Sequence, residues 1–159
     1  MPRKVSVSLQ RVLSPDRRYQ SVLVQRLINK SMLDGKKQVA ERAVYTALEM
    51  AAKKLDSENP LEVFEKALKN VSPNFEVKSR RVGGANYQIP FPVAGHRQLH
   101  YSFTWLVQAA RGRKGIPYSQ RLALEIADAY NETGAAFKKK EDTHKMAEAN
   151  RAFAHFART

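Results

Sequence analysis

The sequence predicts a mainly α protein: a single-domain bundle of about six helices, with a β-hairpin protruding between the third and fourth helices. Apolar residues recur at helical spacing in successive segments that glycine, proline or capping residues bound. Between the third and fourth segments, a stretch of two-residue alternation surrounds a Gly-Gly pair. The 159 residues suffice for one domain with its own core and are few for two, so we expect 1–159 to form one domain.

The first 18 residues predict an extended basic arm. They include Pro2, which disfavours a helix, and Ser14-Pro15-Asp16, which suits a turn or a helix start. A basic segment of this kind gains structure mainly on a polyanionic partner, so we expect 1–18 to become ordered on binding.

Three helices are expected before the hairpin. Apolar spacing places the first over 19–30 and the second over about 37–54, with an Asp-Gly pair between them. The third begins where Asn59 can cap and Pro60 occupies the first helical position, and it ends before Pro73.

The segment 75–93 predicts a two-stranded ribbon that turns at Gly83-Gly84, because paired glycines supply the positive φ that tight hairpins need. A two-stranded ribbon is not stable alone in water, so we expect it to lean on the helices and project its tip. An ordinary surface hairpin is the alternative. Cations near the tip favour insertion into a polyanion. One face of the second strand should carry Tyr87, Ile89, Phe91 and Val93.

Three further helices are expected after the ribbon. The fourth begins near His96 and stops at Gly112, and a basic loop follows it. Ser119 can cap the fifth and Gly134 can close it. The last, over about 136–156, is long, charged and Ala-rich. Phe103 and Trp105 are expected in the core.

Positive charge dominates the chain and is unevenly distributed. The formal net charge is +13 and the pI is about 10.2, which makes a polyanion the leading expectation for a partner. Residues 1–40 carry nine Lys/Arg against two acids, 71–98 four against one, and 99–124 four against none. Residues 41–70, with five against six, are close to neutral. The basic segments are therefore separated by mixed-charge helices.

Several classes of protein are disfavoured. The absence of cysteine excludes disulfides and thiolate-bound metals. No apolar run has the length of a membrane span or of a signal peptide, so we expect no membrane partner and use in the compartment of synthesis. A phosphate-binding loop at Gly35-Lys36-Lys37 would need a glycine where Lys30 stands, so an NTPase is excluded. Lys36 and Lys37 at a helix start suit a nucleic-acid phosphate, and two solvated lysines are the alternative.

The histidines do not predict a catalytic or metal centre. His96 and His100 have the spacing of a two-histidine zinc site, but Arg97 replaces the expected glutamate and no third ligand is near. Packing or RNA contact is favoured over metal. No nucleophile–His–acid spacing is recognisable either. We therefore expect no enzyme activity, no metal and no cofactor.

The chain resembles the small-subunit ribosomal protein seven family, in its bacterial or plastid form, over nearly its whole length. The similarity is long and specific in the ribbon and in the last helix. It rests on Leu33-Asp34-Gly35-Lys36-Lys37, Glu76-Val77-Lys78-Ser79-Arg80-Arg81-Val82-Gly83-Gly84, Tyr87-Gln88-Ile89-Pro90 and the segment from Lys139 to His155.

This resemblance implies a helical bundle with a protruding ribbon, and a structural protein of the small ribosomal subunit that binds ribosomal RNA as a primary binder and nucleates assembly of the head. It also implies a place in the ribosome (in a bacterial cytoplasm or a plastid stroma), near exit-site transfer RNA and messenger RNA. Neighbours would be small-subunit proteins nine and eleven. Repression of its own messenger's translation is a further implication.

Two sets of residues are expected to contact RNA on the basis of the resemblance and the charge pattern. Tyr87 is expected to stack on an exposed base, because a ribbon tip has little core to pack against. The set for ribosomal RNA is Arg3, Lys4, Arg11, Lys30, Lys36, Lys37, Lys78, Arg97, Arg111, Arg113 and Lys114. The set for transfer or messenger RNA is Arg80, Arg81, Val82, Gly83, Gly84, Asn86 and Tyr87.

Two other functions remain as alternatives. A nucleoid-type DNA-binding protein also uses basic β-ribbons, although such arms usually act from dimers. An RNA-modifying enzyme would need a cofactor loop or a convergent acid–base pair, and neither is recognisable. Positive charge spread over several segments favours a folded RNA surface, bound by phosphate neutralisation and shape.

Overall fold

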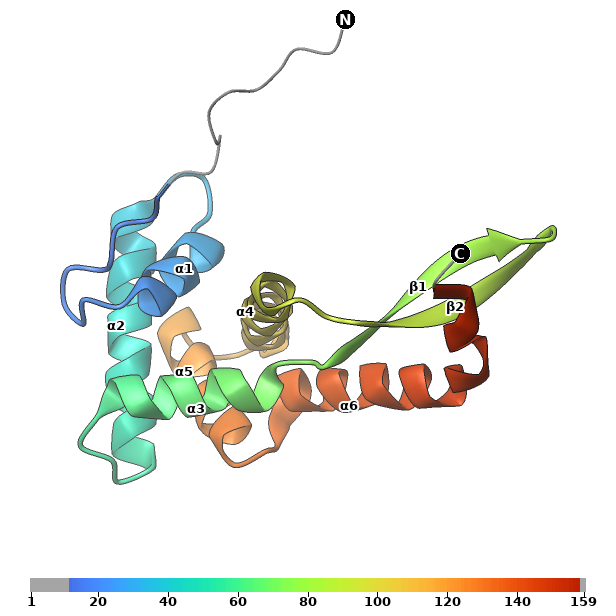
Figure 1. Cartoon of the computed structure of the whole chain (residues 1–159). Helices are drawn as coiled ribbons and strands as arrows, with labels where there is room; N and C mark the ends of the chain where they lie inside the picture. Colours follow the sequence, from blue (N-terminus) through green and yellow to red (C-terminus); the bar gives the residue numbers. More distant parts are fainter. Residues whose placement is uncertain (1–11, 158–159) are drawn as a thin grey trace, which may run out of the picture.

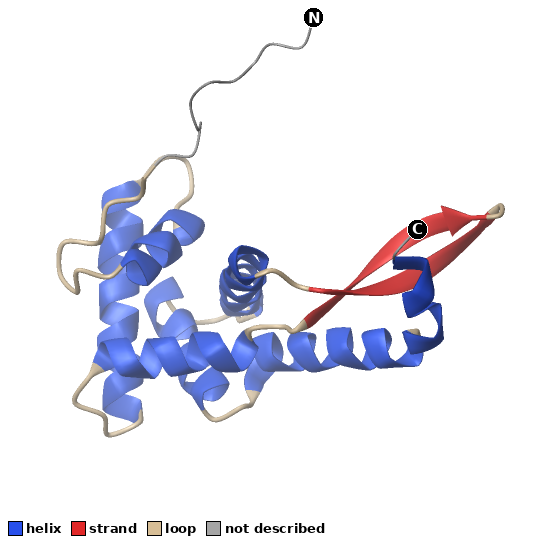
Figure 2. Ribbon diagram, in the orientation of Figure 1, coloured by secondary structure: helices blue, strands red, loops and turns tan. Residues whose placement is uncertain are grey.

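The computed structural model describes residues 12–157 and is mainly α with one two-stranded antiparallel ribbon, which confirms the predicted fold class (Figure 1, Figure 2). No helix in this range is long and apolar enough to cross a membrane. The elements are α1 (Val22–Ser31), α2 (Lys37–Lys54), α3 (Pro60–Val71), β1 (Phe75–Val82), β2 (Ala85–Pro92), α4 (Gly95–Gly112), α5 (Tyr118–Tyr130), α6 (Gly134–Ala149) and the 3₁₀ helix η1 (Arg151–Ala157).

The core lies where α2 and α3 pack against α5, and α4 closes one side of it. Alanines such as Ala47 and Ala51 on α2 are fully buried, and small side chains allow neighbouring helices to approach closely. Larger side chains fill the remaining space, with Phe64 of α3 fully buried beside Phe103 of α4. Phe103 and Trp105 are 4% and 9% exposed, so both belong to the core as expected.

A capped turn delays the first helix. Asp16 is buried, and its carboxylate accepts hydrogen bonds from the backbone N–H groups of Arg18, Tyr19 and Ser21 at 2.8–3.0 Å. Gln20 takes a positive φ of 52° in this turn. The backbone of 17–20 is therefore held away from helical geometry, and α1 begins at Val22 rather than at residue 19.

The N-cap of α3 was predicted correctly, whereas the predicted N-cap of α5 and the glycine predicted to end α5 were wrong. The Asn59 side chain accepts a hydrogen bond from Leu61 N–H at 3.1 Å, with Pro60 at the first helical position. Ser119 lies inside α5, whose N-cap is Pro117. Gly134 opens α6 instead of closing α5, with φ at 88°. A Cβ there would lie 2.9 Å from the Cβ of Asp128, so only glycine fits without displacement.

The last helix is shorter than predicted. In place of one helix over 136–156, α6 ends at Ala149 and the chain continues as η1. Asn150 turns its side-chain amide back to Met146 O at 2.8 Å, the kind of local bond by which asparagine competes with helix continuation. The tighter 3₁₀ winding places residues three apart on one side, so Phe153 and Phe156 stack with centroids 6.5 Å apart.

The ribbon extends from the bundle on the side away from α1 and α2, and α6 runs beside its base (Figure 1). Its strands keep one register throughout, in which Phe75 lies opposite Pro92 at the base and Val82 lies opposite Ala85 at the turn. The turn glycines Gly83 and Gly84 have φ values of 56° and 90°, as the Gly-Gly pair predicted. Ile89 is fully buried, so the predicted apolar face does lean on the helices.

Candidate nucleic-acid interface

The basic residues of α1 and the start of α2 lie on a continuous exposed surface. A recess of about 340 Å³ separates Arg26 and Lys30 from α4, and a second hollow of about 610 Å³ runs from Lys37 past Arg17. Asn29 lines both, so the two hollows adjoin. We call this area, with Arg17, Arg26, Lys30 and Lys37, the α1 surface.

The C-terminal end of α1 is fastened to α4 and α5. Tyr118 O–H donates to Ser31 Oγ at 2.8 Å, and Arg111 Nη2 donates to the Ser31 carbonyl at 3.4 Å. Arg111 therefore lies against the last residue of α1, a contact that the sequence does not predict. Lys36 is exposed where a turn with positive φ at Asp34 and Gly35 leads into α2. Arg111 thus brings a second predicted basic segment to the end of α1.

Arg113 faces inward, unlike its neighbour Lys114. Its guanidinium donates to Glu125 Oε2 at 2.7 Å and forms an ion pair with Asp128. Glu125 is fully buried, and its other oxygen accepts Ala136 N–H at 2.8 Å. A buried carboxylate satisfied in this way fixes the α4–α5 loop to the start of α6. The charge of Arg113 is therefore balanced inside the protein, while Lys114 is exposed.

Arg97 and Lys78, both predicted to bind RNA, meet at a carboxylate at the base of the ribbon. Glu76 of β1 accepts hydrogen bonds from Arg97 at 2.7 Å and from Tyr101 O–H, and pairs with Lys78 at 2.9 Å. Burial alone would raise the pKa of Glu76, but these hydrogen bonds outweigh it and lower the pKa to about 2. We call this cluster the Glu76 junction. It joins β1 to α4.

The ribbon tip presents cations, but its tyrosine is packed. Arg80 and Arg81 are exposed, and Asn86 stands opposite Arg81 in the register. Tyr87 lies 5.1 Å and 5.5 Å from the ring centroids of Phe153 and Phe156 in η1. Tyr87 was expected to stack on a base because a ribbon tip has little core to pack against. That premise is wrong, since Tyr87 packs on η1. The ring is partly buried in an aromatic cluster.

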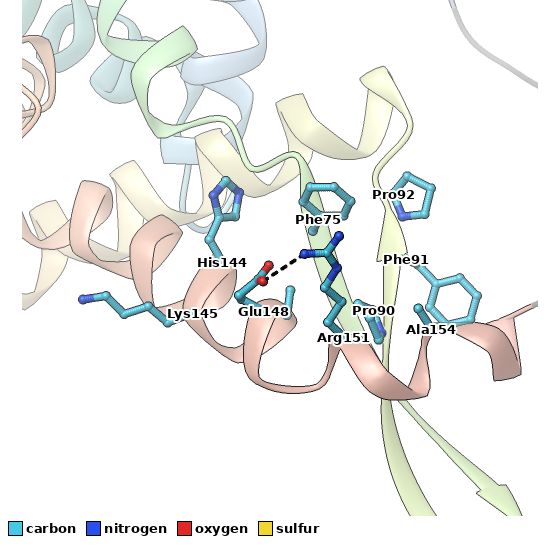
Figure 3. A pocket seen from close by; sticks show the side chains of 10 residues that line it. Phe75, Pro90, Phe91, Pro92, His144, Lys145, Glu148, Arg151 and Ala154 are labelled. Atoms are coloured by element: carbon cyan, nitrogen blue, oxygen red, sulfur yellow. Dashed lines mark hydrogen bonds and ion pairs between the residues drawn. The ribbon is translucent and has the colours of Figure 1, made fainter.

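A groove of about 1010 Å³ lies between the ribbon base and the end of α6 (Figure 3). Phe75, Pro90 and Phe91 line one side, and an exposed pair of Glu148 and Arg151 at 3.3 Å lies on the other. His144 accepts Asn74 N–H at 3.0 Å, which fastens α6 to the segment entering β1. Burial, with a further contribution from Lys140, lowers the pKa of His144.

Two groups of basic residues remain: one that the sequence analysis did not single out, and one that the structure does not describe. Arg26 was not singled out, although its position four residues before Lys30 on one helix face was a readable signal. Arg3, Lys4 and Arg11 lie outside the described residues. Among residues 12–157, no group of three or more histidine, aspartate or glutamate side chains could hold a metal ion.

Comparison with known proteins gives one consistent result. The model of the family described as ribosomal protein S7p/S5e matches residues 2–151. Among curated relatives, a small ribosomal subunit protein uS7 from Chloroflexus aggregans is 55% identical over 158 residues, covering 99% of each chain. Proteins of the same name from Dictyoglomus turgidum (54% over 156 residues, 98% of this chain and 99% of the relative) and Thermomicrobium roseum (53% over 156 residues, with the same shares) are also similar.

Proposed function

Since the chain belongs to the ribosomal protein S7p/S5e family, and is therefore a structural, non-enzymatic constituent of the small ribosomal subunit, we propose that it binds small-subunit ribosomal RNA directly as a primary binder and nucleates assembly of the head. It acts within the ribosome, in a bacterial cytoplasm or a plastid stroma. Proteins nine and eleven of the small subunit are its proposed neighbours, and repression of its own messenger is a second proposed activity.

The single observation that supports RNA binding most strongly is the α1 surface. Its four cations, Arg17, Arg26, Lys30 and Lys37, form no ion pair with any carboxylate in the described residues. Cations without internal partners can release counterions from RNA phosphates, which is the main source of affinity for a polyanion. Recesses between helices favour recognition of RNA shape over reading of base edges.

The ribbon supports a second contact, with exit-site transfer RNA and messenger RNA. Arg81 is exposed beside the turn, and Arg80 is exposed with its guanidinium 5.4 Å from the ring centroid of Phe91. The Glu76 junction and η1 hold the strands in place. Held in this way, the two arginines can reach phosphates that the bundle itself does not touch. Tyr87 contributes to this contact by bracing the tip rather than by stacking on a base.

Replacement of matched sets of cations tests the proposal. The triple variant Arg26→Gln, Lys30→Gln, Lys37→Gln should weaken binding to a head-domain RNA fragment by about tenfold to a thousandfold, because each phosphate contact contributes separately. The control Lys53→Gln, Lys69→Gln, Lys139→Gln removes three exposed charges elsewhere and should change the affinity by less than about threefold. Both variants keep the core intact.

The same titrations distinguish the alternative functions. Wild-type affinity for the RNA fragment should exceed that for duplex DNA of equal length at equal salt, and log affinity should fall with log salt at a slope of several units. Tighter binding to the duplex would favour the nucleoid-type protein. Equal losses in the two triple variants would show that the α1 surface is not the RNA site.

A further inference from the structure

Two histidines of α4 lie in the recess of the α1 surface. His96 and His100 are one helical turn apart, and both are exposed in the space that they share with Arg26 and Lys30. Phe103, 4% exposed, and Leu99 form its apolar part. No carboxylate lines the recess in the part of the chain that the structure describes. Two imidazoles and two cations therefore face one small volume.

The ring nitrogens of both imidazoles lack partners in the part of the chain that the structure describes. In residues 12–157, His96 and His100 form no side-chain hydrogen bond and no ion pair, and His100 has only a ring contact with Tyr101 at 6.0 Å. The two other histidines are both engaged: His144 accepts Asn74 N–H, and His155 Nδ1 lies 2.8 Å from the Ala152 carbonyl. The ring nitrogens in the recess are thus available for a ligand.

The charged groups around the recess favour an anion. Arg26 and Lys30 approach from α1, and neither side chain has an acceptor among residues 12–157. Arg97, which lies between the histidines in sequence, donates instead to Glu76 at the Glu76 junction, and Glu76 does not line the recess. A phosphate placed between the two imidazoles would favour their charged form, because an imidazolium donates from both nitrogens and forms stronger, charge-assisted bonds.

We propose that this recess is a proton-linked phosphate site for RNA, in which His96 and His100 take up protons from solvent as an RNA phosphate enters. The inference rests on the proposed RNA binding and adds a pH dependence to it. Each proton taken up goes to one ring nitrogen, and no other bond changes. Binding should strengthen as the pH falls, because proton uptake on binding makes the affinity rise with proton concentration.

The test measures the affinity of the full chain for a head-domain RNA fragment at constant ionic strength. Between about pH 8 and about pH 6, where imidazole changes charge, wild-type affinity should rise roughly tenfold. The double variant His96→Gln, His100→Gln should lose most of this rise, so that its affinity changes by less than about threefold between the two pH values. The control His155→Gln removes an exposed histidine outside the recess and should keep the full rise.

A second measurement uses the wild type alone and needs no variant to fold. Calorimetry of RNA binding at about pH 7 in two buffers of different ionisation enthalpy should show net proton uptake. Wild-type binding that is independent of pH, or a rise that survives in the double variant, would overturn the inference while leaving RNA binding intact. Failure of the wild type to bind the RNA at any pH would instead overturn the proposed function.

Discussion

Replacing Glu76 with glutamine tests whether charge at the Glu76 junction stabilises the ribbon against the bundle. The lowering of the Glu76 pKa from 4.5 to about 2 corresponds to roughly 3 kcal/mol if the whole shift appears as stability. The Glu76 side chain is 6% exposed, but its partners Lys78 and Arg97 are 46% and 45% exposed, so solvent screens the pairs. We therefore expect Glu76→Gln to lower the free energy of unfolding by about 1–2 kcal/mol at neutral pH.

The direction of the Glu76 pKa shift fixes how its contribution to the free energy of unfolding changes with pH. Because the folded-state pKa of Glu76 lies below 4.5, the stabilisation is complete above that pH and is lost as the pH falls toward about 2. The difference between wild type and Glu76→Gln in urea unfolding should therefore narrow over that interval. Other carboxylates titrate in both proteins, so their contributions cancel in the difference.

A matched carboxylate serves as the control. Glu148 pairs with Arg151 at 3.3 Å but is 74% exposed, so Glu148→Gln should change stability by less than about 0.5 kcal/mol. A difference for Glu76→Gln that stays constant from neutral pH down to about pH 2 would refute the argument, since packing of the side chain would then explain the loss.

Three further changes test other features of the structure. Gly134→Ala should lower stability by about 1–3 kcal/mol in thermal unfolding, because of its positive φ and the close side chain, whereas Gly95→Ala, with open space around it, should be nearly neutral. Tyr87→Ala should speed amide hydrogen exchange in η1 and leave α2 unchanged, because it removes both aromatic contacts. Arg80→Gln with Arg81→Gln should leave unfolding within about 0.5 kcal/mol of wild type but weaken retention of deacylated transfer RNA by assembled subunits. Unchanged retention would exclude the tip contact.

Local sequence signals predicted the elements well where one periodicity continued unbroken. The ribbon and its turn followed from alternation and from Gly83-Gly84, and α3 followed from Asn59 and Pro60. Errors arose where one side chain redirected the backbone. Asp16 delayed α1, and Asn150 ended α6 before a 3₁₀ turn. Both are short polar residues whose partners are not visible in an apolar pattern.

The candidate site was less predictable, because charge counts do not show which charges are paired. Arg113 and Lys114 are adjacent in sequence, yet Arg113 is held by buried Glu125 and Lys114 is exposed. Arg97 likewise is engaged by Glu76, 21 residues away. The recess joins side chains of α1 and α4 that are about 70 residues apart, so its shape exists only in the folded chain. The RNA-contact residues themselves stay a prediction.

Helix α4 connects the recess of the α1 surface to the base of the ribbon, so a small movement of α4 is amplified at the ribbon tip. On one side of its first turns, His96 and His100 face the recess. On the other side, Arg97 and Tyr101 donate hydrogen bonds to Glu76 of β1. A strand of eight residues is about 26 Å long, so a tilt of about 5° at the Glu76 junction displaces the tip by about 2 Å. An adjustment of α4 too small to disturb the core would thus move the tip by nearly the length of a hydrogen bond. The packing of Tyr87 on Phe153 and Phe156 opposes this movement, so α4 and η1 together set the position of the tip.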